Sequence, residues 1–190
     1  MHQDSTRLSR PTVVMHWIVA LTVLGLLAVG FIMHEFKLYS LYGLHKSTGI
    51  AIFVVIVLRV LWRIKEGWPA PASRYQRYEQ LLSRAVHYVL LIATVLMPFS
   101  GILMSLGAGA GLPFYGLDIV ARNPDPANPG KLIPLSEPMA KAGAWLHGLL
   151  AWVLVVAITL HVAGALKHHL VDKDGTLRRM LGARIEPAGE

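Results

Sequence analysis

Three long stretches of the chain contain no charged residue, and this feature limits the fold more than any other. They cover residues 11–34, 85–117 and 142–166. A helix needs about 20 apolar residues to cross about 30 Å of hydrocarbon, because it rises about 1.5 Å per residue. A fourth apolar stretch, residues 44–62, holds two charged residues, Lys46 and Arg59, whose long side chains can reach the interfaces. The sequence therefore predicts four transmembrane helices, at about 14–34, 44–64, 84–107 and 143–167.

The composition agrees with a membrane protein and narrows its chemistry. Of 190 residues, 54% are hydrophobic and 15% are charged, whereas an ordinary soluble domain has about 25% charged residues. The chain contains no cysteine, which excludes disulfides, thiolate zinc sites, iron–sulfur clusters and covalently attached c-type haem. Nine histidines are then the strong nitrogen ligands that a metal centre could use.

Lys and Arg residues are divided unevenly between the two sides of these spans. Thirteen of 18 fall on the side of the two chain ends, and the other five are Lys37, Lys46, Arg122, Lys131 and Lys141. Because positive residues accumulate on the cytoplasmic side, both termini are expected to be cytoplasmic. We therefore expect a single domain, residues 1–190, that is an all-α, integral membrane four-helix bundle. The connection at residues 118–141 contains five prolines and is expected to be extended and irregular.

Two histidines in the last predicted helix are the most informative residues. His147 and His161 are 14 residues apart, which corresponds to about 21 Å of helical rise and nearly four full turns. Both rings therefore project from one face at two depths, too far apart to share one small ion. Each ring could instead bind its own large planar cofactor, and haem iron accepts axial imidazoles. The spacing favours two haems stacked across the bilayer.

Each level of this stack needs a second ligand from another helix. At the outer level His45 matches His147, and at the inner level His16 and His87 both compete to match His161. A single membrane histidine is most often an interfacial residue or an interhelical hydrogen-bond donor. Such a structural role explains one histidine more easily than it explains five histidines at matched depths. For His87, axial ligation, a supporting contact and a quinone contact all stay open.

Several segments, spread over nearly the whole chain, match a known family in order and spacing. They are Met15-His16-Trp17, residues 44–49 and 57–63, His87-Tyr88 with Met97-Pro98 and Gly101, the pair His147 and His161, and residues 166–169 with 172–174 and Leu177. With these segments the chain resembles the bacterial cytochrome b561 family of four-helix, di-haem membrane cytochromes.

The resemblance implies two non-covalent b haems, each with two histidine ligands. By the family pattern the inner haem uses His16 and His161, and the outer haem uses His45 and His147. The family also implies electron transfer with the quinone pool, with ubiquinone as the expected substrate, in the bacterial inner membrane. Some similar members oxidise superoxide on the outer side and pass the electron to ubiquinone, and others are subunits of hydrogenases or dehydrogenases.

Cations near each level are candidates to bind haem propionates. Arg59 lies toward the cytoplasmic end of the second helix, near the inner level, and Lys46 adjoins His45 at the outer level. A cation pairs strongly with a carboxylate when the geometry is favourable, but Lys and Arg at helix ends also snorkel without binding a cofactor. We favour the cofactor role for Arg59, and we keep Lys46 as a candidate beside the snorkelling alternative.

The end of the last helix is a candidate quinone site. His168 and His169 lie where this helix leaves the membrane, and imidazole can donate a proton near neutral pH. A basic patch that contacts anionic lipid headgroups is the simpler alternative for both residues. His87, at the cytoplasmic end of the third helix, is the other candidate for contact with a quinone.

These features predict an oxidoreductase or electron carrier whose partners are the lipid bilayer, a quinone and either a periplasmic electron donor or superoxide. The outer loops carry five positive and four negative residues, so their charge count shows no electrostatic funnel for an anion. The alternative is an electron-relay membrane anchor for a separate dehydrogenase or hydrogenase. A third alternative is a small transporter or channel that uses membrane histidines to move protons. Such a protein would be colourless, because it would hold no haem. Nucleic-acid binding is not expected, because the basic residues are spread over helix ends.

Overall fold

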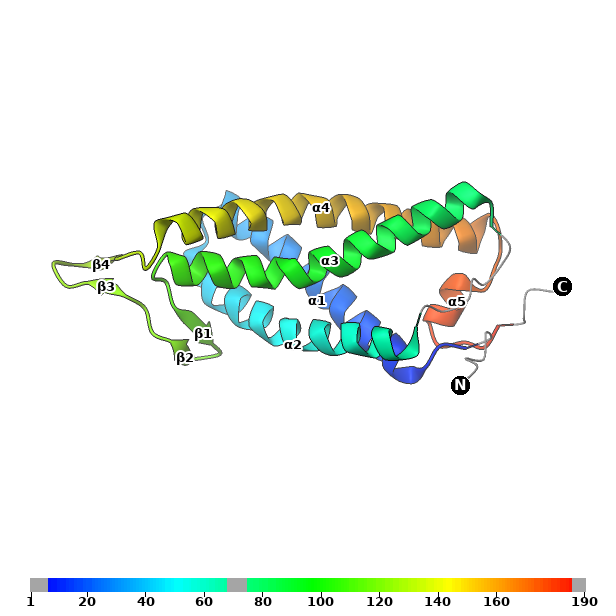
Figure 1. Ribbon diagram of the computed structural model, residues 1–190, viewed down its shortest axis with the longest axis horizontal. Coiled ribbons are helices and arrows are strands. Elements are labelled where there is room, and N and C mark those ends of the chain that lie inside the picture. Colours follow the sequence, from blue (N-terminus) through cyan, green and yellow to red (C-terminus); the bar gives the residue numbers. More distant parts are fainter. Residues whose placement is uncertain (1–6, 68–74, 186–190) are drawn as a thin grey trace.

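The computed structural model describes residues 7–67 and 75–185, and four long helices make up most of it (Figure 1). They are α1 (Arg10–Glu35), α2 (Tyr42–Glu66), α3 (Arg77–Gly107) and α4 (Glu137–Leu170). A 3-10 turn, η1 (Tyr39–Leu41), precedes α2, and a short helix, α5 (Thr176–Met180), follows α4. In the described part of the chain, all four long helices are long and apolar enough to cross a membrane. The predicted helical bundle is therefore confirmed.

The helices extend past the predicted spans, and serines cap the first turns of two of them. Ser9 caps α1, since its side chain accepts a hydrogen bond from the backbone of Thr12, and Ser136 caps α4 in the same way. Gly67 follows the last residue of α2, and its φ of 73° is a left-handed conformation that glycine adopts without strain. α3 begins at Arg77, seven residues before the expected position, and it continues through Pro98 with a bend along its length (Figure 1).

The connection between α3 and α4 forms two hairpins, which corrects the expectation of an irregular loop. Strand β1 (Leu112–Phe114) pairs with β2 (Leu117–Val120), and β3 (Pro124–Asp125) pairs with β4 (Asn128–Leu132), both antiparallel. Tyr115 and Gly116 join β1 to β2 with φ values of 47° and 93°, as in a two-residue hairpin turn. Both hairpins lie at the end of the bundle opposite to α5 (Figure 1).

A buried serine fastens the first hairpin to the bundle. Ser47 in α2 is 2% exposed, and its Oγ donates to the carbonyl of Gly43 and accepts from the backbone N–H of Tyr115 at 3.0 Å. The hydroxyls of Thr48 and Tyr115 are also 3.0 Å apart. The hairpin is therefore held against the first turns of α2.

The core of the bundle is small and apolar, and its outer faces are apolar as well. Val19 on α1, Ile56 on α2 and Leu154 on α4 are among the most deeply buried side chains. Large apolar side chains such as Leu21 and Trp152 are each 63% exposed on the outside. An apolar exterior of this kind suits contact with lipid, because hydrocarbon solvates these groups and water does not.

Candidate functional site

Two pairs of histidines meet inside the bundle, one near each end. We call His45 and His147 the outer pair, because they lie nearer the hairpins, and His16 and His161 the inner pair. The ring centroids are 6.2 Å apart in the outer pair and 6.2 Å apart in the inner pair, with interplanar angles of 75° and 62°. Helix α4 supplies one ring to each pair, as expected from the spacing of its two histidines.

The separation within each pair is the one that a single metal ion needs between two imidazoles. With a metal–nitrogen bond of about 2.0 Å and the bonding nitrogen about 1.2 Å from the ring centre, two imidazoles that bound one metal ion from opposite sides would have ring centres about 6.4 Å apart. The observed 6.2 Å agrees with this value at both levels. The two levels could therefore each hold one iron with two axial imidazoles.

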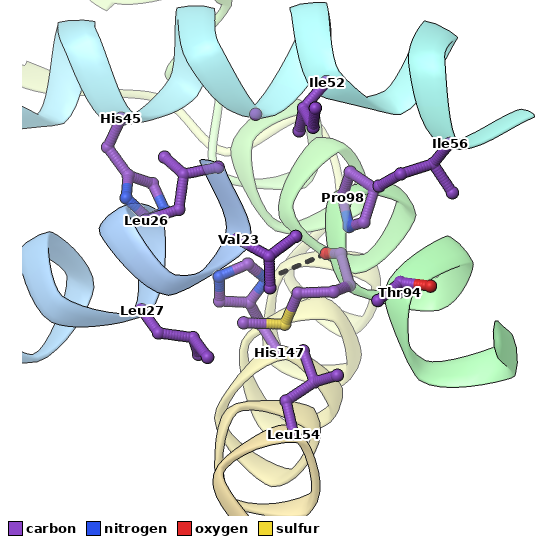
Figure 2. A pocket seen from close by; sticks show the side chains of 12 residues that line it. Val23, Leu26, Leu27, His45, Ile52, Ile56, Thr94, Pro98, His147 and Leu154 are labelled. Carbon is purple, nitrogen blue, oxygen red and sulfur yellow. Dashed lines mark hydrogen bonds between the residues drawn. The ribbon is translucent and has the colours of Figure 1, made fainter. Parts of the chain in front are cut away.

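The outer pair opens into an apolar cavity (Figure 2). The cavity has a volume of about 50 Å³, and besides His45, His147 and Thr94 its lining is glycine and apolar side chains. In Figure 2 the rings of His45 and His147 reach into this space from different helices. A mainly apolar cavity with two inward imidazoles has the chemistry that a porphyrin with axial ligands requires.

Glycines leave room for the rings of the outer pair. A Cβ atom at Gly30 would lie 3.4 Å from Cε1 of His45, and one at Gly101 would lie 3.2 Å from Cε1 of His147. In addition, Nδ1 of His45 is buried and has no hydrogen-bond partner among the described residues, which is unusual for a buried polar atom. Both observations fit a site shaped for imidazoles that bind a further group.

The inner level holds a third imidazole and a guanidinium. The ring of His87 lies 5.0 Å from that of His161 at 85°, and its Nδ1 donates to the carbonyl of Ser83 at 2.6 Å. Nη2 of Arg59 lies 3.0 Å from Nδ1 of His16. Both predicted competitors, His16 and His87, therefore lie beside His161. The 5.0 Å separation is shorter than two ligands on opposite sides of one iron require, whereas the separation from His16 fits.

The two predicted propionate partners lie at different levels. The half-buried Arg59 contacts the inner pair through His16. Lys46 follows His45 in α2, is half-buried, and interacts electrostatically with Arg122 from the loop after β2. Each level thus has at least one cation that could neutralise a carboxylate.

The predicted quinone residues fall in two places. His87 lies beside His161, whereas His168 and His169 lie two turns further along α4 and are partly exposed. Nδ1 of His168 is 2.7 Å from a carboxylate oxygen of Asp172, and its ring packs 4.5 Å from that of Tyr75.

This region forms a polar network around the last turn of α4. The Tyr75 hydroxyl donates to Asp174 at 2.6 Å, and burial together with this hydrogen bond raises the pKa of Tyr75 to about 12. Hydrogen bonds from Lys167 and His168 lower the pKa of Asp172. The network links α4 to α5 and to the segment that precedes α3.

Sequence reasoning missed the groups that contact His147. Its Nδ1 is 3.1 Å from the carbonyl oxygen of Met97 and 3.0 Å from Oγ of Ser100. A usable signal was present, because Ser100 is a polar residue in the charge-free stretch 85–117, 13 residues after His87. That interval nearly equals the spacing of the two α4 histidines.

Comparisons with known proteins identify the family. The family model of prokaryotic cytochrome b561 matches residues 7–183. The chain is 37% identical over 172 residues to cytochrome b561 homolog 2 of Escherichia coli (strain K12), which covers 88% of this chain and 87% of that protein. It is 29% identical over 170 residues to the probable superoxide oxidase CybB of Yersinia pestis, with 87% and 90% covered. It is 24% identical over 186 residues to cytochrome b561 homolog 1 of Escherichia coli (strain K12), with 94% and 98% covered.

The family match covers most of the chain and agrees with the histidine-rich helical bundle. The chain therefore belongs to the prokaryotic cytochrome b561 family, whose members are haem-binding electron-transfer proteins of the bacterial inner membrane.

Proposed function

We propose that this chain is a di-haem b cytochrome that moves electrons across the inner membrane between a donor on the outer side and the quinone pool. His45 and His147 would hold one haem, and His16 and His161 the other. One observation carries the proposal: two imidazole pairs with the same 6.2 Å separation share helix α4. Each pair has the separation that two axial ligands of a single iron need.

The chain's own residues would bind, shield and tune the cofactor. When bound, haem supplies a one-electron redox centre whose potential depends on its ligands, nearby charges and burial. Val23, Ile52 and Leu154 line the outer cavity and exclude water from it. Arg59 and Lys46 supply positive charge, and each would pair with a propionate at its own level.

Superoxide is the outer donor and ubiquinone the acceptor in this proposal. The relative from Yersinia pestis is named a probable superoxide oxidase, which supports the donor. The charges of Lys46 and Arg122 interact, so two cations lie near the outer pair and would attract an anion even though the outer loops are nearly neutral in total. His87, His168 and His169 are the proposed contacts of the quinone headgroup, since each lies toward the inner end of the bundle.

An electron-relay anchor for a separate dehydrogenase or hydrogenase is the second candidate. The observation that favours it is the hairpin of β3 and β4, which projects beyond the helices (Figure 1). All five residues of β4 are exposed. A partner protein could contact this hairpin outside the bilayer, whereas a chain that works alone does not need it.

Haem content and quinone reduction test these proposals in sequence. The purified protein is expected to contain two b haems per chain, with spectra that change on reduction, and a colourless protein would refute the proposal. Superoxide and ubiquinone are then supplied together. A quinone-dependent rate supports the oxidase, and its absence in a protein that holds both haems supports the relay.

A further inference from the structure

Helix α3 supplies no ligand to either proposed haem, yet it packs closely against α4. Gly107 on α3 and Gly143 on α4 let the two backbones touch, because a Cβ at either position would overlap the facing helix. Ser100 and His87 are 13 residues apart on α3, close to the 14-residue spacing of the α4 histidines. Since the two helices are antiparallel, Ser100 meets His147 and His87 meets His161.

Ser100 and the backbone of Met97 hold the ring of His147. Ser100 is 0% exposed, and its hydroxyl donates to the Met97 carbonyl at 2.7 Å. Nδ1 of His147 lies 3.0 Å from Ser100 Oγ and 3.1 Å from the same carbonyl oxygen. The dashed line in Figure 2 marks the contact with the carbonyl.

These contacts determine which nitrogen of His147 carries the proton. A carbonyl oxygen only accepts, and the proton of the Ser100 hydroxyl is already donated to Met97. Nδ1 must therefore be the donor, so that the neutral ring has its lone pair on Nε2. Histidines that bind metals usually donate their other N–H in this way, which fixes the ring and strengthens it as a ligand.

His87 has the corresponding place at the inner level. Its Nδ1 donates to the Ser83 carbonyl one turn earlier in α3, which fixes the orientation of its ring. The ring then meets that of His161 edge to face, at 5.0 Å between centroids. At this separation His87 supports His161 from the side and cannot share an iron with it from the opposite face.

We propose that α3 positions the two α4 imidazoles, His147 through Ser100 with the Met97 carbonyl, and His161 through His87. The inference rests on the proposed function, in which both imidazoles bind haem iron. Ser100 and His87 are positioning residues that act through these imidazoles.

A purely structural role for Ser100 is the competing explanation, because its hydroxyl would be satisfied by Met97 alone. The control is Ser105, a second buried serine of α3, which is 3% exposed and donates to the carbonyl of Gly111. Substitution of either serine by alanine removes one buried hydroxyl from the same helix. Only Ser100 contacts a histidine of the pairs.

The first experiment measures haem content and the midpoint potential of each haem in full-length Ser100→Ala and Ser105→Ala proteins. Single-haem variants at His147 and His161 assign the two potentials. Ser100→Ala is expected to keep two haems and to shift the outer haem alone to a more positive potential, because His147 loses one of two acceptors and becomes a weaker donor to iron. Ser105→Ala is expected to shift neither.

The outer-level half of the inference is overturned if Ser100→Ala leaves the outer potential unchanged, or if Ser105→Ala shifts it equally. If Ser100→Ala does not accumulate, Ser100→Cys preserves the side-chain volume with a poor acceptor and is expected to give the same shift. A wild-type protein without haem would instead refute the proposed function, so the two failures are distinguishable.

The second experiment compares His87→Leu with His34→Leu, an exposed histidine of α1. His87→Leu is expected to keep two haems and to change the midpoint potential and the low-spin electron paramagnetic resonance signal of the inner haem alone. The His34 variant is expected to match the wild type. Loss of one haem in His87→Leu would show that His87 is a haem ligand. An unchanged inner haem would show that His87 does not position His161. Either result overturns the part of the inference that concerns the inner level.

Discussion

The outer and inner pairs have the same ring separation but very different surroundings. The outer pair opens into an apolar cavity, and His147 is held by a carbonyl and a hydroxyl. The inner pair has a third imidazole at its side and the guanidinium of Arg59 against His16. Equal spacing suits the same kind of ligation. Both levels have cations, but at the inner level a guanidinium is in direct contact with a ring of the pair. Since positive charge close to a haem favours its reduced state, we expect the inner haem to have the higher potential, which would draw electrons inward.

Loss of a ligand should give the largest effect and separates the two levels. His147→Ala is expected to remove the outer haem and leave the inner one, and His161→Ala is expected to do the reverse, because no ring serves both pairs. Haem measured per chain should fall from two to one in each variant. His34→Ala, outside both pairs, should retain two. If either ligand variant keeps both haems, the pairs are wrongly assigned.

Removal of the charge at the inner pair should sharpen the comparison. Arg59→Gln is expected to lower the midpoint potential of the inner haem by tens of millivolts and to leave the potential of the outer haem unchanged. For a one-electron couple, about 59 mV corresponds to a tenfold change in the equilibrium constant. Redox titration of the two haems measures this shift. An equal shift of both would mean that Arg59 acts on the whole bundle and not on one level.

The contact between Ser47 and the hairpin of β1 and β2 lies at the outer end of the bundle and has no counterpart described at the inner end. Ser47→Ala removes the hydroxyl that binds the backbone of Tyr115, so it is expected to lower the free energy of unfolding by about 1–2 kcal/mol. Denaturation in detergent, followed by helical signal, measures the loss. Thr48→Val, which removes an exposed hydroxyl contact with Tyr115, should cost less. A larger loss in the Thr48 variant would contradict the importance given to the buried serine.

The polar network at the inner end should give the smallest effect. Burial and the hydrogen bond to Asp174 raise the pKa of Tyr75 from 10.0 to about 12. Its neutral form therefore stabilises the fold below pH 10, and this contribution is lost as the pH rises toward 12. An absorbance titration of tyrosinate should show this late step in the wild type and not in Tyr75→Phe. A titration curve that the substitution leaves unchanged above pH 11 would contradict the assignment.

Helix positions could be predicted from the sequence because charge-free runs reflect the membrane itself. The helix ends were less predictable, since caps such as Ser9 and Gly67 lie outside the apolar runs. The hairpins were missed because their strands are short and three of the four contain proline. The first hairpin is also held by Ser47, which lies 66 residues earlier in the chain than Pro113. Such a contact between distant segments leaves no local pattern.

For the candidate site, depth along each helix predicted which histidines share a level, and the structure places those residues together. Depth does not give the direction in which a ring points around the helix axis. For that reason spacing alone left both His16 and His87 competing for His161, and the choice of His16 came from the family resemblance. The ring separations of 6.2 Å and 5.0 Å favour the same choice. The role of Ser100 depends on the same directional information.

The presence of both His147 and His161 on one continuous helix makes the length of the intervening segment matter more than its composition. One added or deleted residue would rotate one ring by about 100° relative to the other and shift it by about 1.5 Å. A single-residue insertion between positions 148 and 160 would thus turn one imidazole away from its partner, while most apolar exchanges there would be tolerated. Natural variation in this segment should accordingly consist of substitutions and not of insertions or deletions.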